Sequence, residues 1–442
     1  MLSLICLILS PLFRQYRYVL QYQYSDLSIS ECCTYRSQCL LLTSSSMLCP
    51  YLNIIYFVYG QFTFKVGGEG TSANYFFVLI PIYYIIKEMK LFLPHKDLLL
   101  VMLCFCTLFF LASAIQIEYW DIFHRKLISF LLFFTAFIFA FIRVDNHMIT
   151  AFKLGTTIFT LLLALNNLLE YRSFDVQDLG YAAKNQVGNQ RYGFMYVFVF
   201  WMILFFKTEK LFVQLAKIPA LILCFTGIFL TFSRSSIVAF AFSIMILALY
   251  FARSRNIFST KLFIQILSYS FLIICIITYS GYYEYLLVPF EFFSERFTEL
   301  FTGEGINLTN IYSSEGYRVF LLRKILEFLG TSPFFGSGYL GIWILFEDKA
   351  GSAHGQFNDI LFRSGVIGLL IYGYLLIKIL KFLKETDFGM YIGFWGIIAF
   401  GLFHETFKLS HGAFILAFIV GMWATYAREN TYTEKSLNEN SD

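Results

Sequence analysis

The sequence predicts an all-α, polytopic integral membrane protein with about twelve transmembrane helices and one long extracytoplasmic loop. Hydrophobic residues make up 58% of the chain and charged residues only 14%, whereas a soluble domain is about 25% charged. The apolar residues also fall into runs of helical length. The net charge of +4 is small for 442 residues, and the basic residues stand singly beside apolar runs, so a nucleic-acid partner is not indicated.

The first 46 residues differ from the rest, because they mix Tyr, Gln, Ser and Cys around one short apolar run. No clean signal peptide is present. From Met47 the sequence MLCPYLNIIYFVYGQFTF is typical of a first membrane span. We therefore expect residues 1–46 to be a doubtful extension or a tail, with translation starting at Met47.

A bilayer core about 30 Å thick needs roughly 20 apolar residues per helix. From Met47 onward, runs of this kind centre on residues 50–64, 73–86, 97–116, 126–143, 147–169, 193–206, 212–231, 235–252, 261–280, 356–380, 389–404 and 411–427. Residues 47–280 thus hold the first nine of these spans and 356–427 the last three. Residues 281–355 form the long loop, and 428–442 a cytoplasmic tail.

The short connections predict the orientation. With a cytoplasmic N-terminus, the inner connections carry the basic residues Lys87, Lys90, Lys96, Arg143, Lys207, Lys210, Arg253, Arg255, Lys261, Lys378, Lys381, Lys384 and Arg428. This satisfies the positive-inside rule. The segments 170–192, 232–236 and 281–355 then all fall on the outer side, where we expect the function to reside.

Two of these outer segments offer cationic side chains near the membrane surface. The first, DVQDLGYAAKNQVGNQRYG, contains Lys184, Asn185 and Arg191. It is either a solvated loop near lipid phosphates or a cationic patch for an anionic lipid-linked substrate. The second, LTFSRSSIVAF, places Arg234 between two apolar runs. An arginine there either snorkels to headgroups or lines a wet cavity as a bidentate phosphate ligand.

The long loop carries the third group. Its stretch from Tyr317 to Gly330 has apolar residues at helical spacing and predicts an amphipathic helix that carries Arg318. The turn TSPFFGSGYLG ends that helix. His354 then precedes an apolar helix, with Asn358 one turn later on the same face. His354 is either a surface or capping residue, or a neutral base near pH 7.

The motifs AAKNQVG, TFSRSS and SP-x-x-G-x-G followed by AH, in this order, resemble the bacterial O-antigen ligase and polymerase superfamily over about residues 170–375. The resemblance implies a GT-C-like helical membrane fold and a glycosyltransferase of the inner membrane, with its active site facing the periplasm. It implies donors linked to undecaprenyl pyrophosphate and no bound metal or other cofactor. A chain-length regulator is a candidate partner.

The resemblance also implies roles for individual residues. Arg234 and Arg318 match the arginines that grip pyrophosphate, and His354 matches the histidine that assists the acceptor. Independently of the resemblance, Lys184, Asn185 and Arg191 in the first outer segment are candidates for substrate binding. The family's frequent His-Asn pair reads His354-Gly355 here, so that Asn358 is the candidate for the role of the asparagine.

The motifs do not separate a repeat-unit polymerase from a ligase that moves the finished glycan to lipid A core. We favour the polymerase, because no feature can be assigned to a lipid A core acceptor. A flippase for lipid-linked sugars is the alternative from another class, but matching internal halves are not evident. His404, Glu405 and His411 either line the cavity or have packing or interfacial roles, and we favour the latter. Two histidines without a third ligand do not indicate a metal site.

Overall fold

The computed structural model describes residues 63–66, 69–72, 86, 91–114, 133–134, 136–171, 190–253, 314–338, 341–346, 353–408 and 410–439. The chain divides into two units, Met1–Asn53 and Ile54–Asp442, and all described residues lie in the second. The predicted extension 1–46, the span 261–280 and the pair Lys184 and Asn185 lie outside the described residues.

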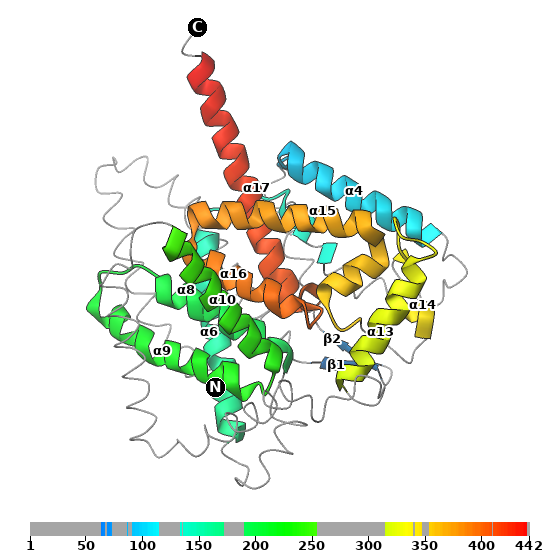
Figure 1. Cartoon of the computed structure of the whole chain (residues 1–442). Coiled ribbons are helices and arrows are strands. Elements are labelled where there is room, and N and C mark those ends of the chain that lie inside the picture. The colour runs from blue at the N-terminus through cyan, green and yellow to red at the C-terminus, as the bar shows by residue number, and fades with distance from the viewer. Residues whose placement is uncertain are drawn as a thin grey trace. The chain divides into compact units, whose positions relative to one another are not determined.

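The described part is built from helices (Figure 1). The apolar helices are α4 (Lys96–Ala114), α6 (Asn146–Tyr171), α8 (Gly193–Phe205), α9 (Leu211–Leu230), α10 (Arg234–Arg253), α15 (Gln356–Thr386), α16 (Phe388–Gly401) and α17 (Ser410–Glu439), of which α8 and α16 are the shortest. Short helical segments are η4 (Gln190–Tyr192), α13 (Ser314–Leu329), α14 (Trp343–Phe346) and η7 (Thr406–Lys408).

The predicted spans agree closely with these helices. Each long apolar helix begins within one residue of a predicted span. Within the described residues, α4, α6, α9, α10 and α15 are each long and apolar enough to cross a membrane, and α8 and α16 are shorter apolar helices. The helical membrane character is therefore confirmed, while the total of twelve spans stays a prediction because other expected spans fall wholly or partly outside the described residues.

One short β-hairpin departs from the all-α expectation. Strands β1 (Thr63–Val66) and β2 (Glu69–Ser72) pair antiparallel, with Val66 opposite Glu69. β1 thus takes the last two residues of the expected span 50–64. The local sequence TFKVGGEGTS explains this, because β-formers that flank a Gly-Gly pair are a favoured hairpin pattern.

The core of the described helices is α8 packed between α16, α9 and α10, with α6 against α9. Glycines allow the backbones of α8 and α16 to approach closely. A Cβ atom added to Gly393 would lie 2.9 Å from the carbonyl oxygen of Phe198, and one added to Gly396 would lie 2.5 Å from Val197 Cγ1. Small residues at such spacing are the usual means of close helix packing in membranes.

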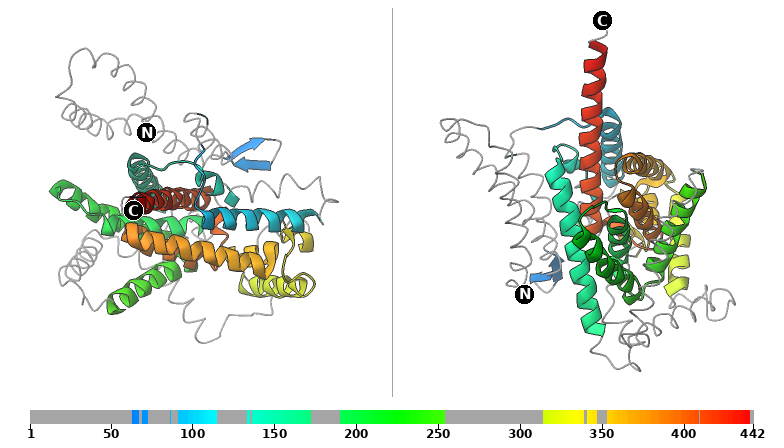
Figure 2. Two further views of the ribbon diagram at one scale, coloured as in Figure 1. Left: turned by 90° about the horizontal axis from the view of Figure 1, so that it is seen from above. Right: turned by 90° about the vertical axis from the view of Figure 1, so that its left-hand side faces the viewer.

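Two further helix pairs flank this core. α6 and α17 lie side by side, as Figure 2 shows, with Phe152 stacked on Phe418 at a ring-centroid distance of 4.2 Å. α4 lies along α15. Large apolar side chains are exposed on α4 at Phe110, on α15 at Leu370 and on α9 at Phe212. In water such faces would be costly, so they are the faces that lipid covers.

α15 is broken near its start. Gly365 has φ 65° and ψ −166°, which separates the first turns of the helix from the long segment that follows. The loop from Ser332 to Gly338 satisfies the freed backbone groups: Val366 N donates to the carbonyl of Pro333 (2.9 Å), and Ser337 N donates to the carbonyl of Phe362 (2.7 Å). The SP-x-x-G-x-G motif therefore completes the hydrogen bonding of the break.

Basic residues assigned to the inner side gather at one end of the helices. Lys378 Nζ lies 2.7 Å from the carboxylate of Asp97, and the guanidinium of Arg428 donates to the carbonyls of Phe92, Ala140 and Ile142. Lys153, which is not one of the residues assigned to the inner side, pairs with Asp387 just before α16. The start of α4, the end of α15 and the start of α16 thus share one end, as the charge pattern predicts.

Candidate functional site

The opposite end holds the candidate site, where α8 and α10 begin and α16 ends. A Cβ atom built on Gly193, the first residue of α8, would lie 1.8 Å from Ser236 Oγ of α10 and 3.0 Å from the ring of Phe400 in α16. The three helix ends therefore touch. Each is followed or preceded by a polar segment that the sequence assigns to the outer side.

The turn before α10 brings Arg234 to this end. Phe232 has a positive φ of 47°, a conformation that non-glycine residues adopt mainly where the surroundings impose it. Ser233 Oγ and Ser235 Oγ lie 2.6 Å apart on either side of Arg234. The arginine is half-buried at the first position of the helix.

His404, just after α16, closes the other side of this turn. Its Nε2 lies 2.8 Å from Ser235 Oγ, and its ring stacks on Phe400 at 4.6 Å. Burial, with the nearby positive charge of Arg318 as the next cause, lowers the pKa of His404 to about 4. The imidazole is therefore neutral at physiological pH and acts as a fixed hydrogen-bonding group.

His354 lies in the loop that enters α15. It has a positive φ of 51°, and its ring meets the ring of Tyr317 edge-on at 5.7 Å. Burial lowers the pKa of His354 below its usual value, and the charges of Arg318 and Arg191 act in the same direction, while Glu405 opposes them. A neutral imidazole at this position can accept a proton at neutral pH.

Most predicted site residues described by the structure thus meet at one place. Arg191 in η4 and Arg318 in α13 both act electrostatically on His354 and His404. Arg318 is half-buried and Arg191 exposed. Arg234 is adjacent in sequence to Ser235, which contacts His404, so Arg234 lies near the same group. The predicted amphipathic helix is α13, whose buried side holds Leu321, Ile325 and Leu329, and Arg323 is exposed as its different stripe predicts.

Asn358 lies beside the His354 loop. It stands in the first turn of α15 and is half-buried. A Cβ atom added to Gly355 would lie 3.2 Å from the side-chain amide nitrogen of Asn358. The amide is therefore next to the residue that replaces the expected asparagine, and its role in substrate binding stays a prediction.

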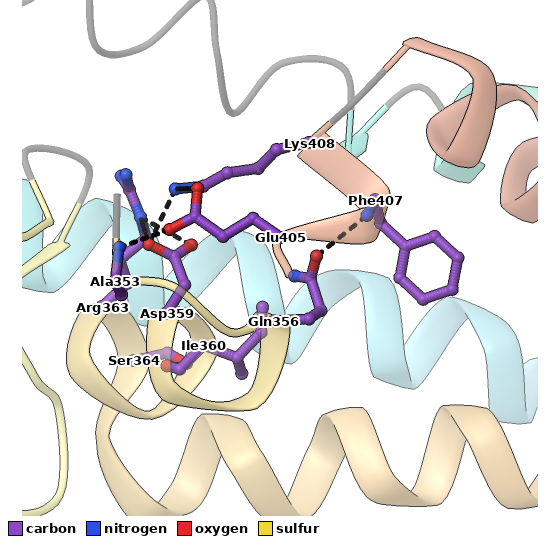
Figure 3. A network of polar contacts seen from close by, with 9 residues as sticks. All are labelled: Ala353, Gln356, Asp359, Ile360, Arg363, Ser364, Glu405, Phe407 and Lys408. Atoms are coloured by element: carbon purple, nitrogen blue, oxygen red, sulfur yellow. Dashed lines mark hydrogen bonds and ion pairs between the residues drawn. The ribbon is translucent and has the colours of Figure 1, made fainter. Parts of the chain in front are cut away.

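A buried network of charged side chains holds the loop that carries His354 (Figure 3). Glu405 Oε1 accepts the backbone N–H of Ala353 at 2.6 Å, and Glu405 Oε2 lies 3.0 Å from Lys408 Nζ. Lys408 Nζ also lies 2.8 Å from Asp359 Oδ1, and both oxygens of Asp359 accept from Arg363 Nε at 3.0 Å. Two acids and two bases thus balance each other in a region with little access to solvent.

Sequence reasoning missed part of this site. His404 and Glu405 are not among the predicted site residues, yet they contact Ser235 and Ala353. His411 does pack, because it is 2% exposed and stacks on Phe159. The available signal was two pairs of opposite charges at helical spacing within apolar surroundings: Glu405 with Lys408, and Asp359 with Arg363.

Among the described residues, no group of three or more His, Cys, Asp or Glu side chains is arranged to hold a metal ion. The cations present at the candidate site are side chains, chiefly Arg191, Arg234 and Arg318. Guanidinium groups bind phosphate oxygens in bidentate fashion. Together with a neutral imidazole they form a site suited to an anionic phosphate group and a neighbouring hydroxyl.

Comparison with known proteins identifies the segment that carries most of this site. Residues 219–373 match the family model described as O-antigen ligase. The matched segment runs from α9 into α15 and includes Arg234, Arg318 and His354. A search of curated proteins found no match. The resemblance drawn from the sequence is therefore confirmed over residues 219–373.

Proposed function

We propose that this membrane protein, whose residues 219–373 match the family described as O-antigen ligase, is a glycosyltransferase that polymerises repeat units linked to undecaprenyl pyrophosphate. The observation that carries the proposal is the meeting of Arg191, Arg318 and His354 at one end of the helices. In this proposal that end faces the periplasm from a bacterial inner membrane. Lys378 and Arg428, which the sequence assigns to the inner side, lie at the opposite end of the helices, and this supports the orientation.

The donor chemistry requires little more than fixed positive charge. A pyrophosphate is a good leaving group, and its departure leaves negative charge on phosphate oxygens. Arg318 and Arg234 would bind these oxygens, and Arg191 would add a third cation at the exposed rim. Lys184 and Asn185 are further candidates for substrate binding. The polyprenyl chain would remain in the lipid beside the exposed apolar faces of the helices.

The acceptor requires a base. In the proposed step, the acceptor hydroxyl oxygen attacks the anomeric carbon of the donor sugar while its proton passes to the neutral imidazole of His354. A new glycosidic C–O bond forms, and the C–O bond to the pyrophosphate breaks. The electron pair of that bond leaves with the pyrophosphate, whose charge the guanidinium groups stabilise. Asn358 would hydrogen-bond the incoming sugar.

A ligase is the second candidate, and the description of the matching family favours it. The same donor site would serve both reactions, since the two differ in the acceptor: a lipid-linked repeat unit or the sugar of lipid A core. Deletion of the gene separates them. Surface polysaccharide reduced to a core with one repeat unit supports the polymerase, whereas accumulated long lipid-linked chains support the ligase and overturn the polymerase proposal.

Arg318 and Arg323 provide a matched pair of variants on one helix. Arg318 is half-buried near His354 and His404, and Arg323 is exposed. We expect Arg318→Ala to abolish polysaccharide extension in a complemented deletion strain, and Arg323→Ala to retain it, with both proteins present in the membrane at similar levels. Normal polysaccharide ladders from Arg318→Ala, Arg234→Ala and His354→Ala would refute the enzymatic role of this site.

A purified-protein assay addresses the transporter alternative. The protein in lipid vesicles is supplied with undecaprenyl-pyrophosphate-linked repeat units, and both glycosidic products and substrate movement across the bilayer are measured. New glycosidic bonds support the proposal. Movement of substrate without new bonds would overturn it in favour of a flippase.

A further inference from the structure

The loop that carries His354 is held by contacts on both sides of the histidine. Before it, Ala353 N donates to Glu405 Oε1 at 2.6 Å. After it, Gln356 N donates to the carbonyl of His404 at 3.1 Å, and Asp359 N donates to the carbonyl of Gly355 at 2.9 Å. The first two of these contacts come from the segment after α16, and the first is the one made by a side chain.

His354 needs such support because its backbone is in the left-handed region, with φ 51°. For a residue with a Cβ atom this conformation costs about 1–2 kcal/mol relative to the right-handed one. Without external contacts the loop would relax to other conformations and the imidazole would move. The Glu405 carboxylate replaces solvent as the partner of the preceding N–H and thereby selects the conformation.

Glu405 is itself held in place. Its second oxygen contacts Lys408 Nζ, which also contacts Asp359, and Asp359 is bound by Arg363 from the next turn of α15 (Figure 3). A Cβ atom on Gly341 would lie 2.6 Å from the Arg363 guanidinium. These contacts hold the Glu405 carboxylate against α15 and, through Arg363, against the loop that contains Gly341. The carboxylate therefore has little freedom to change its orientation.

We propose that Glu405 is a positioning residue for His354, which it fixes through the backbone of Ala353, and that Lys408, Asp359 and Arg363 tie it to α15. This inference rests on the proposed function for the role of His354 in the reaction. It adds a residue that the matched family segment, which ends at residue 373, does not include. Glu405 has two separable effects, the hydrogen bond and the charge.

The charged and titratable groups that face His354 come from several segments. Arg318 lies on α13, Arg191 on η4, and His404 and Glu405 in the segment after α16. The arginines disfavour the imidazolium and Glu405 favours it, so that removal of the Glu405 charge lowers the pKa of His354 further. The acidic limb of the pH–rate profile, which follows protonation of the base, then moves to lower pH.

Two conservative variants separate the effects. Glu405→Gln keeps an oxygen at the same reach for Ala353 N but removes the charge, whereas Glu405→Asp keeps the charge but withdraws the carboxylate by one methylene. We expect Glu405→Asp to lower kcat by about tenfold or more, as for a lost hydrogen bond to a charged group, with the donor KM little changed and the acidic limb in place. Glu405→Gln should retain more of kcat and shift the acidic limb to lower pH.

The assay measures glycosidic product from purified protein in lipid nanodiscs with undecaprenyl-pyrophosphate-linked repeat units, from about pH 5 to pH 8, where histidine titrates. Hydrogen exchange of the backbone around Ala353 is followed by mass spectrometry on the same samples and does not depend on activity. Faster exchange in Glu405→Asp than in wild type supports the positioning role.

The outcomes remain distinguishable. If wild-type protein forms no glycosidic bonds but exchange around Ala353 rises in Glu405→Asp, the proposed function fails while the positioning of the loop stands. If wild type is active and Glu405→Asp matches it in kcat and in hydrogen exchange, Glu405 is not a positioning residue. Superimposable pH profiles for wild type and Glu405→Gln would refute the effect of the charge.

Discussion

Gly365 is the residue at which α15 breaks, and its replacement by alanine tests whether the break is required. Its φ of 65° with ψ −166° lies in a region used almost solely by glycine. A Cβ atom there would lie 2.3 Å from the carbonyl oxygen of Phe334 and 2.7 Å from the backbone nitrogen of Phe335. Backbone atoms cannot rotate away as a side chain can, so the loop or the helix must move.

The expected magnitude follows from two opposite contributions. The backbone conformation alone costs an alanine about 1–3 kcal/mol, and the contact with Phe334 adds to that cost. In an ordinary helical position the same substitution stabilises by about 0.5–1 kcal/mol. Gly373 provides such a position on the same helix, because no atom lies within 4 Å of an added Cβ. The two variants should therefore differ by roughly 2–4 kcal/mol in the free energy of unfolding.

Thermal unfolding in detergent, followed by fluorescence, measures this difference. A gap on the order of 2–4 °C is expected between Gly365→Ala and Gly373→Ala. Gly365→Ala should also lose polysaccharide extension, since the break directs the segment that carries Asp359 toward the site. Equal melting temperatures and equal activities for the two variants would refute the reasoning that the break and its loop are one unit.

Three further outcomes are expected. Asp359→Asn leaves the buried Arg363 without its full counter-charge and should lower the free energy of unfolding by about 3–5 kcal/mol, measured as loss of folded protein in size-exclusion chromatography. Lys324→Ala breaks an exposed pair with Glu327 and should cost less than about 1 kcal/mol in the same assay. The pKa of His404 is lowered to about 4 in the folded protein, whereas an unfolded histidine has a pKa of about 6.5. The free energy of unfolding is therefore unaffected by His404 above about pH 6.5 and decreases as the pH falls toward 4, because the unfolded state binds the proton more readily. His404→Gln should flatten this pH dependence of the melting temperature, and an unchanged slope would contradict it.

The sequence was sufficient to locate the described helices along the chain. Hydropathy placed the start of each apolar helix that the structure describes within one residue, because a bilayer imposes a length on each span and leaves polar residues at its ends. The same argument sorted Arg428 and Lys378 to one end and Arg191 and Arg318 to the other. Hydropathy failed at Thr63 and Phe64, where a local hairpin pattern decides the structure.

The site was predictable only in part, because its geometry depends on contacts between distant segments. His354 and Arg318 could be chosen from their position in a polar loop. His404 contacts Ser235 across a sequence separation of 169 residues, and nothing local to either residue reports that contact. The sequence of the SP-x-x-G-x-G motif predicts a turn that ends a helix. Its further role is to provide hydrogen-bond partners for the backbone groups freed by the break in α15, and this requires Pro333 and Val366 to be adjacent in space.

The shortness of α8 and α16 has a consequence for how a lipid-linked donor reaches the site. At 13 and 14 residues, each helix is about 20 Å long, which is roughly 10 Å less than the hydrocarbon core. Their inner ends meet where the rings of Phe205 and Phe388 lie 4.9 Å apart. In the proposed orientation, with these ends at the inner interface, their outer ends beside Arg191 and His404 would stop below the headgroup plane. A pyrophosphate would be drawn down into the membrane rather than lifted out of it, and the polyprenyl chain could enter sideways without leaving the lipid.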